Sequence, residues 1–328
     1  MECLRRKRHK AGWAWLRMRV RMFATGVLAV GAAGVGRAGP SLEKANRLYE
    51  SGDVVSAVRA YREALSRGEN PALCSFNLGN AYFRLDSMAQ SIVYYRTCTV
   101  HAPDFFRGHY NLGIAYARLG NFGECIASIR RALELEPEHR NARAALAAAY
   151  RNVGAFPEAA VCYERLAERF PEGYEYTLAL GEIYRRLDDP HEALHWFSRY
   201  PDDGPRWGYA RQAMAGIARE RGRLEQAAYF LKQALAHEPG NRWLLYRIVD
   251  VYREAGKPLL AMEEASRGIA RFPEFAELAL LAGNIAFDRE EYERAAYFYG
   301  RARELGSAGG VVGLENVRLI RREHAAAR

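Results

Sequence analysis

The chain has 328 residues and a formal net charge of +9, and its length alone suggests about two domains. The charge is unevenly distributed. Residues 1–38 hold nine Lys or Arg against one acidic residue, which leaves 39 basic and 38 acidic groups in the rest of the chain. Because sequence-independent binding to nucleic acid needs a basic surface, this near-neutral remainder argues against a nucleic-acid partner.

Residues 1–38 have the composition of a secretory signal peptide. An apolar, uncharged run, Met22–Gly36, follows three arginines and overlaps Gly36-Arg37-Ala38, which is typical of a small-residue cleavage site. The run is shorter than the about 20 apolar residues of a membrane-spanning helix. We therefore expect cleavage near Gly39 and a periplasmic or secreted protein, and a start at Met18 would give a compact signal. The alternative is an uncleaved membrane anchor at residues 17–38.

From residue 39 to residue 306 the sequence repeats with a period of 34 residues. Proline marks the period at Pro103, Pro137, Pro171, Pro205, Pro239 and Pro273. Small residues recur at Ala45, Gly79, Gly113, Ala147, Gly181, Ala215 and Gly283, with Val249 as the exception. Further columns hold tyrosine (Tyr82, Tyr116, Tyr150, Tyr184, Tyr252), glycine (Gly52, Gly120, Gly154, Gly222, Gly256, with Asp86 and Asp188 replacing it) and alanine (Ala57, Ala159, Ala193, Ala227, Ala261, Ala295). Eight units are therefore predicted.

Each column has a physical reason. Glycine past the last turn of a first helix takes the left-handed conformation without a Cβ clash. Proline cannot continue a second helix and restrains the residue before it. Small residues in the remaining columns let paired helices approach closely. The chain is therefore predicted to be a series of antiparallel helix hairpins, and in the fifth unit Pro201 is expected to end the second helix about a turn early.

This period and these columns resemble the tetratricopeptide repeat (TPR) family from about Ser41 to Gly306. The resemblance implies an all-α fold, a right-handed superhelical solenoid of about eight helix-turn-helix units in which each unit depends on its neighbours. It also implies a protein-interaction scaffold, in which the first helices line a concave groove that binds partner peptides or helices.

The last segment, residues 307–328, is expected to be a linker, a capping helix and a frayed tail. Gly306 to Gly310 break the repeat pattern, and Leu314, Val317 and Ile320 then fall on one helix face. Terminal repeats need a cover with a polar outer face. We expect that cover at Val311 to about His324.

One motif suggests an enzyme, a zinc-dependent peptidase. His191-Glu192-Ala193-Leu194-His195 matches H-E-x-x-H, whose two imidazoles bind zinc from one helix face. However, Ala193 belongs to the repeat alanine column, no G-x-x-H follows, and both histidines are expected to be exposed. We therefore predict no enzyme, no metal site and no cofactor.

The cysteines after the signal segment are predicted to be packed, mostly reduced thiols. Cys125 and Cys98 occupy small-residue positions, and the spacings among Cys74, Cys98, Cys125 and Cys162 match no metal site.

Two sets of residues are expected to line the groove. The first is an arginine ladder with the 34-residue period: Arg151, Arg185, Arg219 and Arg253, with Arg84 and Arg118 one residue further on in earlier units. Guanidinium groups bind carboxylates bidentately, so the ladder suits an acidic partner segment. The alternative is that these arginines pair with Glu182, Asp250, Glu220 and Glu254 inside the groove.

The second set lies in the amino-terminal half and consists of Tyr49, Phe76, Asn77, Asn80, Phe83, Arg107 and Tyr110. Asn46, Asn77 and Arg107 match three positions of the carboxylate clamp found in some TPR proteins. Leu42 and Asn111 stand where that clamp has a lysine and an arginine, which favours an amphipathic groove over a true clamp. The leading hypothesis is thus an exported, non-enzymatic scaffold with a protein or peptide partner, and the alternative is a membrane-anchored assembly factor.

Overall fold

The computed structural model describes residues 39–326, so the expected signal peptide, residues 1–38, lies outside the described residues, as do residues 327–328. Residues 39–326 form 17 helices and no strand, which confirms the predicted all-α fold. The chain divides into two compact units, and the boundary falls between Leu166 and Ala167. None of the helices described has the length and apolar character that crossing a membrane requires.

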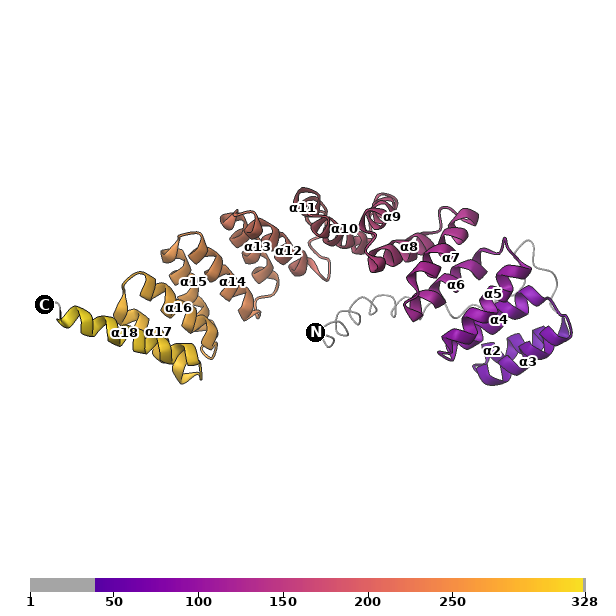
Figure 1. Ribbon diagram of the computed structural model, residues 1–328, viewed down its shortest axis with the longest axis horizontal. Coiled ribbons are helices and arrows are strands. Elements are labelled where there is room, and N and C mark those ends of the chain that lie inside the picture. Colours follow the sequence, from indigo (N-terminus) through magenta and orange to yellow (C-terminus); the bar gives the residue numbers. More distant parts are fainter. Residues whose placement is uncertain (1–38, 327–328) are drawn as a thin grey trace. The chain divides into compact units, whose positions relative to one another are not determined.

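The first unit is a row of helix hairpins in which consecutive helices from α2 to α8 pack on one another (Figure 1). Its helices are α2 (Pro40–Glu50), α3 (Val54–Ser66), α4 (Pro71–Arg84), α5 (Met88–His101), α6 (Phe106–Leu119), α7 (Phe122–Leu135), α8 (Arg140–Val153) and α9 (Phe156–Arg169), and α9 contains the boundary.

The second unit continues the same alternation of first and second helices. Its helices are α10 (Tyr174–Arg186), α11 (Pro190–Ser198), α12 (Trp207–Glu220), α13 (Leu224–His237), α14 (Arg242–Glu254), α15 (Pro258–Arg271), α16 (Ala276–Asp288), α17 (Tyr292–Glu304) and α18 (Ala308–Ala326). The helix α11 stops at Ser198, which confirms the early end predicted from Pro201.

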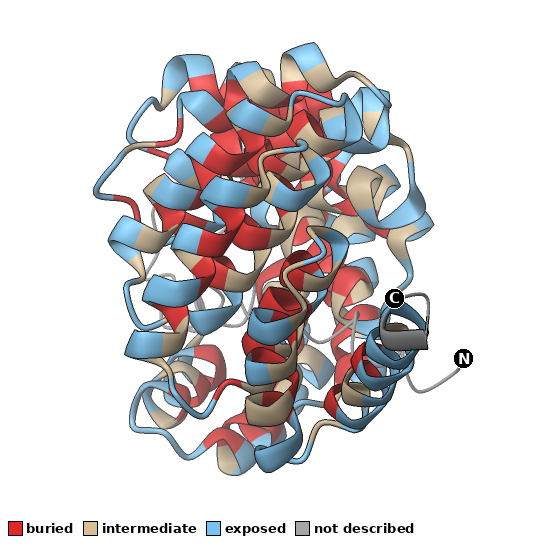
Figure 2. Cartoon of the chain, turned by 90° about the vertical axis from the view of Figure 1, so that its left-hand side faces the viewer, coloured by how far each residue is buried: buried red, intermediate tan, exposed pale blue. Residues whose placement is uncertain are grey.

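The sequence columns form the core between paired helices, where Figure 2 shows the buried residues. All six residues of the alanine column are fully buried. The glycine column ends the first helices with positive φ, as at Gly120 (φ 80°). Asp86 and Asp188 adopt the same conformation, with φ of 58° and 57°. The columns therefore place close helix contacts and helix ends where the sequence predicted them.

The carboxy-terminal helix α18 begins at Ala308, three residues before the expected start at Val311. A Cβ at Gly310 would lie 2.6 Å from the Tyr299 carbonyl oxygen of α17, and one at Gly313 would lie 2.5 Å from the Tyr299 ring. The glycines therefore bring α18 against α17, and the linker predicted from them is part of the helix. Val317 is buried, as expected for the covering face.

Candidate functional site

A polar cluster fixes the side chain of Asn46 on the first helix of the first unit. Its Oδ1 accepts hydrogen bonds from the Tyr61 hydroxyl at 2.9 Å and from Asn77 Nδ2 at 3.0 Å. Both acceptor positions of the amide oxygen are therefore used, which sets the direction of the amide. Within the described residues, the two N–H donors of Asn46 Nδ2 have no partner, and they are available to a ligand.

The same cluster recurs one repeat later around Asn80, which is half-buried. Its Oδ1 accepts from the Tyr95 hydroxyl at 2.6 Å and from Asn111 Nδ2 at 3.0 Å. The Asn80 NH2 group also lacks a partner in the part of the chain that the structure describes. Two oriented amide donors thus stand one repeat apart on α2 and α4, a spacing that suits the polar groups of an extended chain.

The clamp-like residues do not assemble into a clamp. Leu42, at the expected lysine position, is fully buried, and Asn77 is 2% exposed with its Nδ2 bonded to Asn46. Arg107 is exposed, and Asn111 bonds to Asn80. The prediction that this region is no true clamp agrees with these contacts.

The predicted aromatic lining is partly inside the protein. Phe76 and Tyr49 are 3% and 4% exposed. The ring of Phe76 packs edge-on against Phe105 with centroids 5.1 Å apart, because neighbouring repeats close over this position. These two residues and Asn77 therefore support the surface from within, and of the predicted aromatics only Phe83 and Tyr110 are half-exposed to a ligand.

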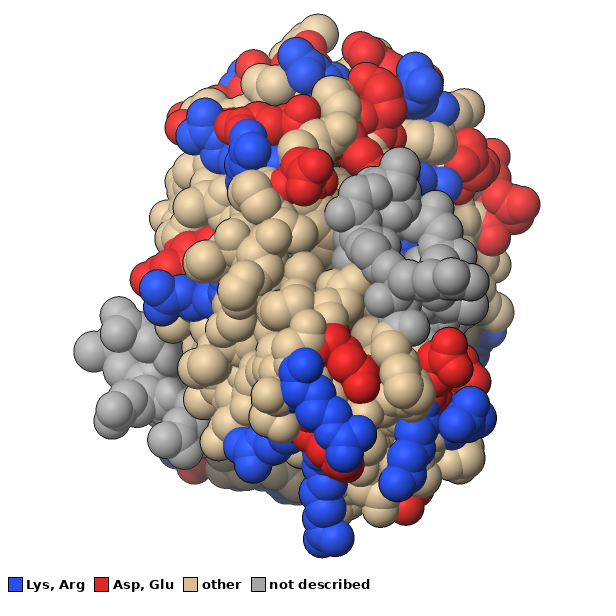
Figure 3. All heavy atoms as spheres, turned by 90° about the vertical axis from the view of Figure 1, so that its right-hand side faces the viewer, with Lys and Arg blue, Asp and Glu red and all other residues tan. Residues whose placement is uncertain are grey.

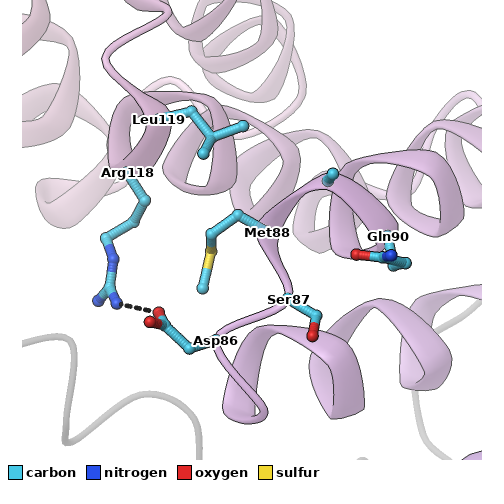
Figure 4. A pocket seen from close by; sticks show the side chains of 7 residues that line it. Asp86, Ser87, Met88, Gln90, Arg118 and Leu119 are labelled. Carbon is cyan, nitrogen blue, oxygen red and sulfur yellow. Dashed lines mark hydrogen bonds and ion pairs between the residues drawn. The ribbon is translucent and has the colours of Figure 1, made fainter.

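Arg84 and Arg118 each lie over an aromatic ring of the preceding repeat. Their guanidinium carbons stand 5.3 Å from the ring centroids of Tyr49 and Phe83, respectively. Arg118 also forms an ion pair with Asp86 at 3.0 Å, beside an open notch of about 580 Å³ (Figure 4). Cation–π contacts of this kind stabilise the stacking of repeats.

The arginine ladder is neutralised by carboxylates at its carboxy-terminal end. Arg219 donates to Asp250 and to Glu254, each at 2.8 Å, and Arg253 pairs with the other oxygen of Asp250 at 2.9 Å. The hydrogen bond to Glu254 is the main cause that raises the pKa of Arg219. Two of the carboxylates foreseen as internal partners, Asp250 and Glu254, therefore pair with these arginines.

The other two rungs of the ladder differ from each other. Arg185 pairs with Glu182 at 3.1 Å, and Glu182 also accepts from the Tyr209 hydroxyl at 2.7 Å. Arg151 belongs to the first unit, is half-buried, and has no carboxylate within ion-pair distance among residues 39–326. The ladder is therefore mainly a set of structural ion pairs, with Arg151 as the exception.

Sequence reasoning missed one cationic residue of the second unit. Arg247 on α14 donates to the Gln212 side-chain oxygen of α12 at 3.0 Å. It lies outside both arginine columns, so the period did not reveal it. The sequence feature that could have drawn attention to this region is Gly216, a glycine inside α12 that belongs to none of the predicted columns.

The paired histidines project from α11 into solvent. The His191 side chain is 92% exposed, and His195 is exposed as well, as predicted. Across residues 39–326, no group of three or more His, Cys, Asp or Glu side chains is placed to hold a metal ion.

The four cysteines Cys74, Cys98, Cys125 and Cys162 are free and buried. Burial raises the pKa of the first three thiols to about 12 and raises that of Cys162 as well. They are packing residues, as predicted, and Cys98 and Cys125 fill the small-residue positions of the repeat.

Charge on the described surface is mixed. On the face drawn in Figure 3, Lys and Arg alternate with Asp and Glu around a broad uncharged area. On this face the charged residues do not form the continuous basic patch that is typical of a nucleic-acid interface.

Comparison with known proteins identifies the repeat. Models of the tetratricopeptide repeat match residues 42–98, 106–139, 145–206 and 218–285, more than half of the chain. The protein belongs to the tetratricopeptide repeat family. No curated protein matches this TPR chain significantly.

Solved structures share the fold at low identity. A chain of Naa15/Naa10 bound to HypK-THB is 17% identical with a TM-score of 0.59, covering 82% of this chain and 43% of its own length. YrrB, a TPR protein with an unusual peptide-binding site, is 16% identical with a TM-score of 0.51, covering 58% of this chain and 98% of its own. A TPR protein from Parabacteroides merdae is 21% identical with a TM-score of 0.47, covering 79% and 98%. Family and fold support a protein-interaction scaffold.

Proposed function

We propose that this TPR protein is an exported, non-enzymatic scaffold that binds a segment of a partner protein along its first helices. The observation that carries the proposal is the repeated polar cluster around Asn46 and Asn80. In each cluster the amide oxygen accepts hydrogen bonds within the fold and the NH2 group has no partner among residues 39–326, so the donors are oriented before a ligand arrives. Preorganised donors reduce the entropy lost on binding.

The chemistry of these donors selects a polypeptide. Backbone carbonyl groups recur along an extended chain and accept hydrogen bonds whatever the side chains are. The half-exposed rings of Phe83 and Tyr110 lie on the neighbouring first-helix positions and offer apolar contact. A segment with polar backbone and apolar side chains matches both features.

The test uses Asn80→Asp, a change that keeps the shape of the side chain. The carboxylate still accepts from Tyr95 and Asn111, but the two N–H donors are lost and a negative charge replaces them. Among peptides selected on the full chain from a random library, those that bind the first unit should bind this variant about 10-fold or more weakly, because hydrogen bonds between oriented groups are removed and carbonyl oxygens are repelled.

Asn284→Asp is the matched control. Asn284 also accepts from a tyrosine hydroxyl, Tyr299 at 2.9 Å, but it lies in the second unit. Peptides that bind the first unit should lose affinity with Asn80→Asp and not with Asn284→Asp. If the library yields no binding peptide, or if both variants bind as tightly as the wild type, the proposal fails.

Export is the second part of the proposal and rests on residues 1–38. The arginines, the apolar run and Gly36-Arg37-Ala38 support it. Fractionation of producing cells followed by amino-terminal sequencing tests it, and an intact amino terminus in the membrane fraction supports the anchored alternative.

A further inference from the structure

A second candidate site lies on the seam between α12 and α14 of the second unit. Gln212 and Gly216 stand one turn apart on α12, and Arg247 of α14 reaches Gln212 across the seam. Arg219, the next rung along α12, crosses the same seam to Asp250. We call Gln212, Gly216 and Arg247 the Arg247 site.

The guanidinium of Arg247 forms no ion pair with any of the residues that the structure describes. It is half-buried, and its one bonded partner among the described residues is the neutral amide of Gln212. Arg219 and Arg253, on the same seam, each bond to carboxylates. Burial, followed by the positive charge of Arg219, lowers the pKa of Arg247. A half-buried cation without a counter-ion favours an incoming anion.

The site has free donors and free space. An arginine offers five N–H donors, of which this fold uses one, and the NH2 group of Gln212 has no partner in the region that the structure describes. A Cβ added to Gly216 would meet no atom within 4 Å. Glycine is less favourable than alanine inside a helix, and no neighbour requires it here. The space over Gly216 is therefore room for a ligand.

Exposed aromatic side chains flank the site. Trp243 lies one turn before Arg247 on α14 and is 49% exposed, and Tyr209 lies one turn before Gln212 on α12 and is 39% exposed. Trp243 is held against Phe275, with ring centroids 5.0 Å apart. A rigid exposed ring one turn from a half-buried cation suits a ligand that is apolar next to its acidic group.

We propose that the Arg247 site binds an Asp or Glu side chain within an acidic segment of the partner, with an adjacent apolar residue resting on Trp243. The carboxylate accepts from Arg247 and from the Gln212 amide, in the space over Gly216. The surface continues on both sides of Arg247, to Trp243 and to Arg219, which fits an internal side chain and not a chain terminus. This inference rests on the proposed function and adds the ligand chemistry of the second unit.

The experiment selects random peptides on the full chain, displayed as amino-terminal fusions so that no peptide carboxyl terminus is free. Selected peptides are then synthesised with amidated ends, and their affinities are measured for the wild type and for Arg247→Gln. We expect Asp or Glu next to an apolar residue to be enriched. Arg247→Gln should weaken these peptides about 10-fold or more, because charge-assisted hydrogen bonds are the strong ones.

Two further variants keep the result interpretable. Arg253→Gln makes the same change on the same helix at an ion-paired arginine, and it should leave affinity within about 2-fold. Gly216→Leu changes no charge and should fold with unchanged circular dichroism while it blocks binding about 10-fold, since it fills the space over α12.

The outcomes separate this inference from the proposed function. Peptides without acidic enrichment, or acidic peptides that bind Arg247→Gln as tightly as the wild type, overturn the inference. Acidic peptides that bind only with a free carboxyl terminus overturn it too. If selected peptides weaken with Asn80→Asp and are unaffected by Arg247→Gln, the inference fails and the proposed function stands; if no peptide is selected, both fail.

Discussion

Gly283→Ala tests the close helix packing on which the repeat depends. A Cβ at Gly283 would lie 2.6 Å from Cδ1 of Tyr299, whereas real Cβ contacts are rarely this short. The ring cannot move away, because Gly313 of α18 packs closely against it from another helix. A Cβ built on Gly313 would lie only 2.5 Å from the same Tyr299 Cδ1 atom. The clash must therefore be relieved by shifting helices, which costs about 1–3 kcal/mol.

Gly216→Ala is the matched control for this change. Both glycines lie inside first helices of the second unit, and alanine gains about 0.5–1 kcal/mol of helix stability at either position. At Gly216 the added Cβ meets no atom within 4 Å, so the gain is expected in full. The free energy of unfolding should thus differ by about 1–3 kcal/mol between the two variants, with Gly216→Ala the more stable.

Urea unfolding followed by tryptophan fluorescence measures this difference. From residue 39 onward the tryptophans are Trp196, Trp207 and Trp243, all in the second unit, so the signal reports that unit. Equal unfolding midpoints for the two variants, or a Gly283→Ala variant more stable than the wild type, would refute the packing argument.

Three further predictions follow from single sites. His139 Nδ1 accepts a hydrogen bond from the Ala142 N–H and so caps the start of α8. Burial lowers the pKa of His139 in the folded protein below the value of about 6.5 in the unfolded chain. The cap therefore stabilises the fold fully above a pH of about 6.5, and this stability is lost as the pH falls through the pKa of the folded protein. Thermal melts should show that the free energy of unfolding is about 1 kcal/mol lower at pH 5 than at pH 7. The His139→Asn variant should not show this difference, because asparagine caps a helix without titrating. The double variant His191→Ala, His195→Ala should have an unchanged melting temperature and peptide affinity. If the wild type binds stoichiometric zinc and the double variant does not, the prediction that these histidines form no metal site is wrong. Amino-terminal sequencing should show that the exported chain begins near Gly39, and an uncleaved chain contradicts that expectation.

Much of the fold was predictable because its determinants are local and periodic. A residue past a first helix needs positive φ, which glycine and aspartate supply, so helix ends follow from the sequence. Pro201 ended α11 early for an equally local reason. The start of α18 was not predictable from Gly309 and Gly310, because Gly309 lies against Leu280 of α16 and Gly310 against the backbone of α17, contacts that the local sequence does not reveal.

The candidate site was less predictable. A residue's position on the groove-facing side of a helix does not determine whether the next repeat covers it or forms hydrogen bonds with it. Phe76 faces the neighbouring repeat and is covered by Phe105. Asn80 was foreseen as a groove residue, but its orientation depends on Tyr95 and on the next repeat. Arg247 belongs to neither arginine column, since it stands at the repeat position that holds Asn77 and Asn111 in earlier units. What distinguishes it is that no carboxylate among the described residues pairs with it.

The central claim, that partners bind along the first helices, is tested most directly by mapping cross-links. A selected peptide that carries a photoreactive residue is bound to the full chain, irradiated and located by mass spectrometry. The account predicts cross-links on first helices, α2, α4 and α6 in the first unit or α12 and α14 in the second. Cross-links confined to second helices such as α5 and α13 would contradict it.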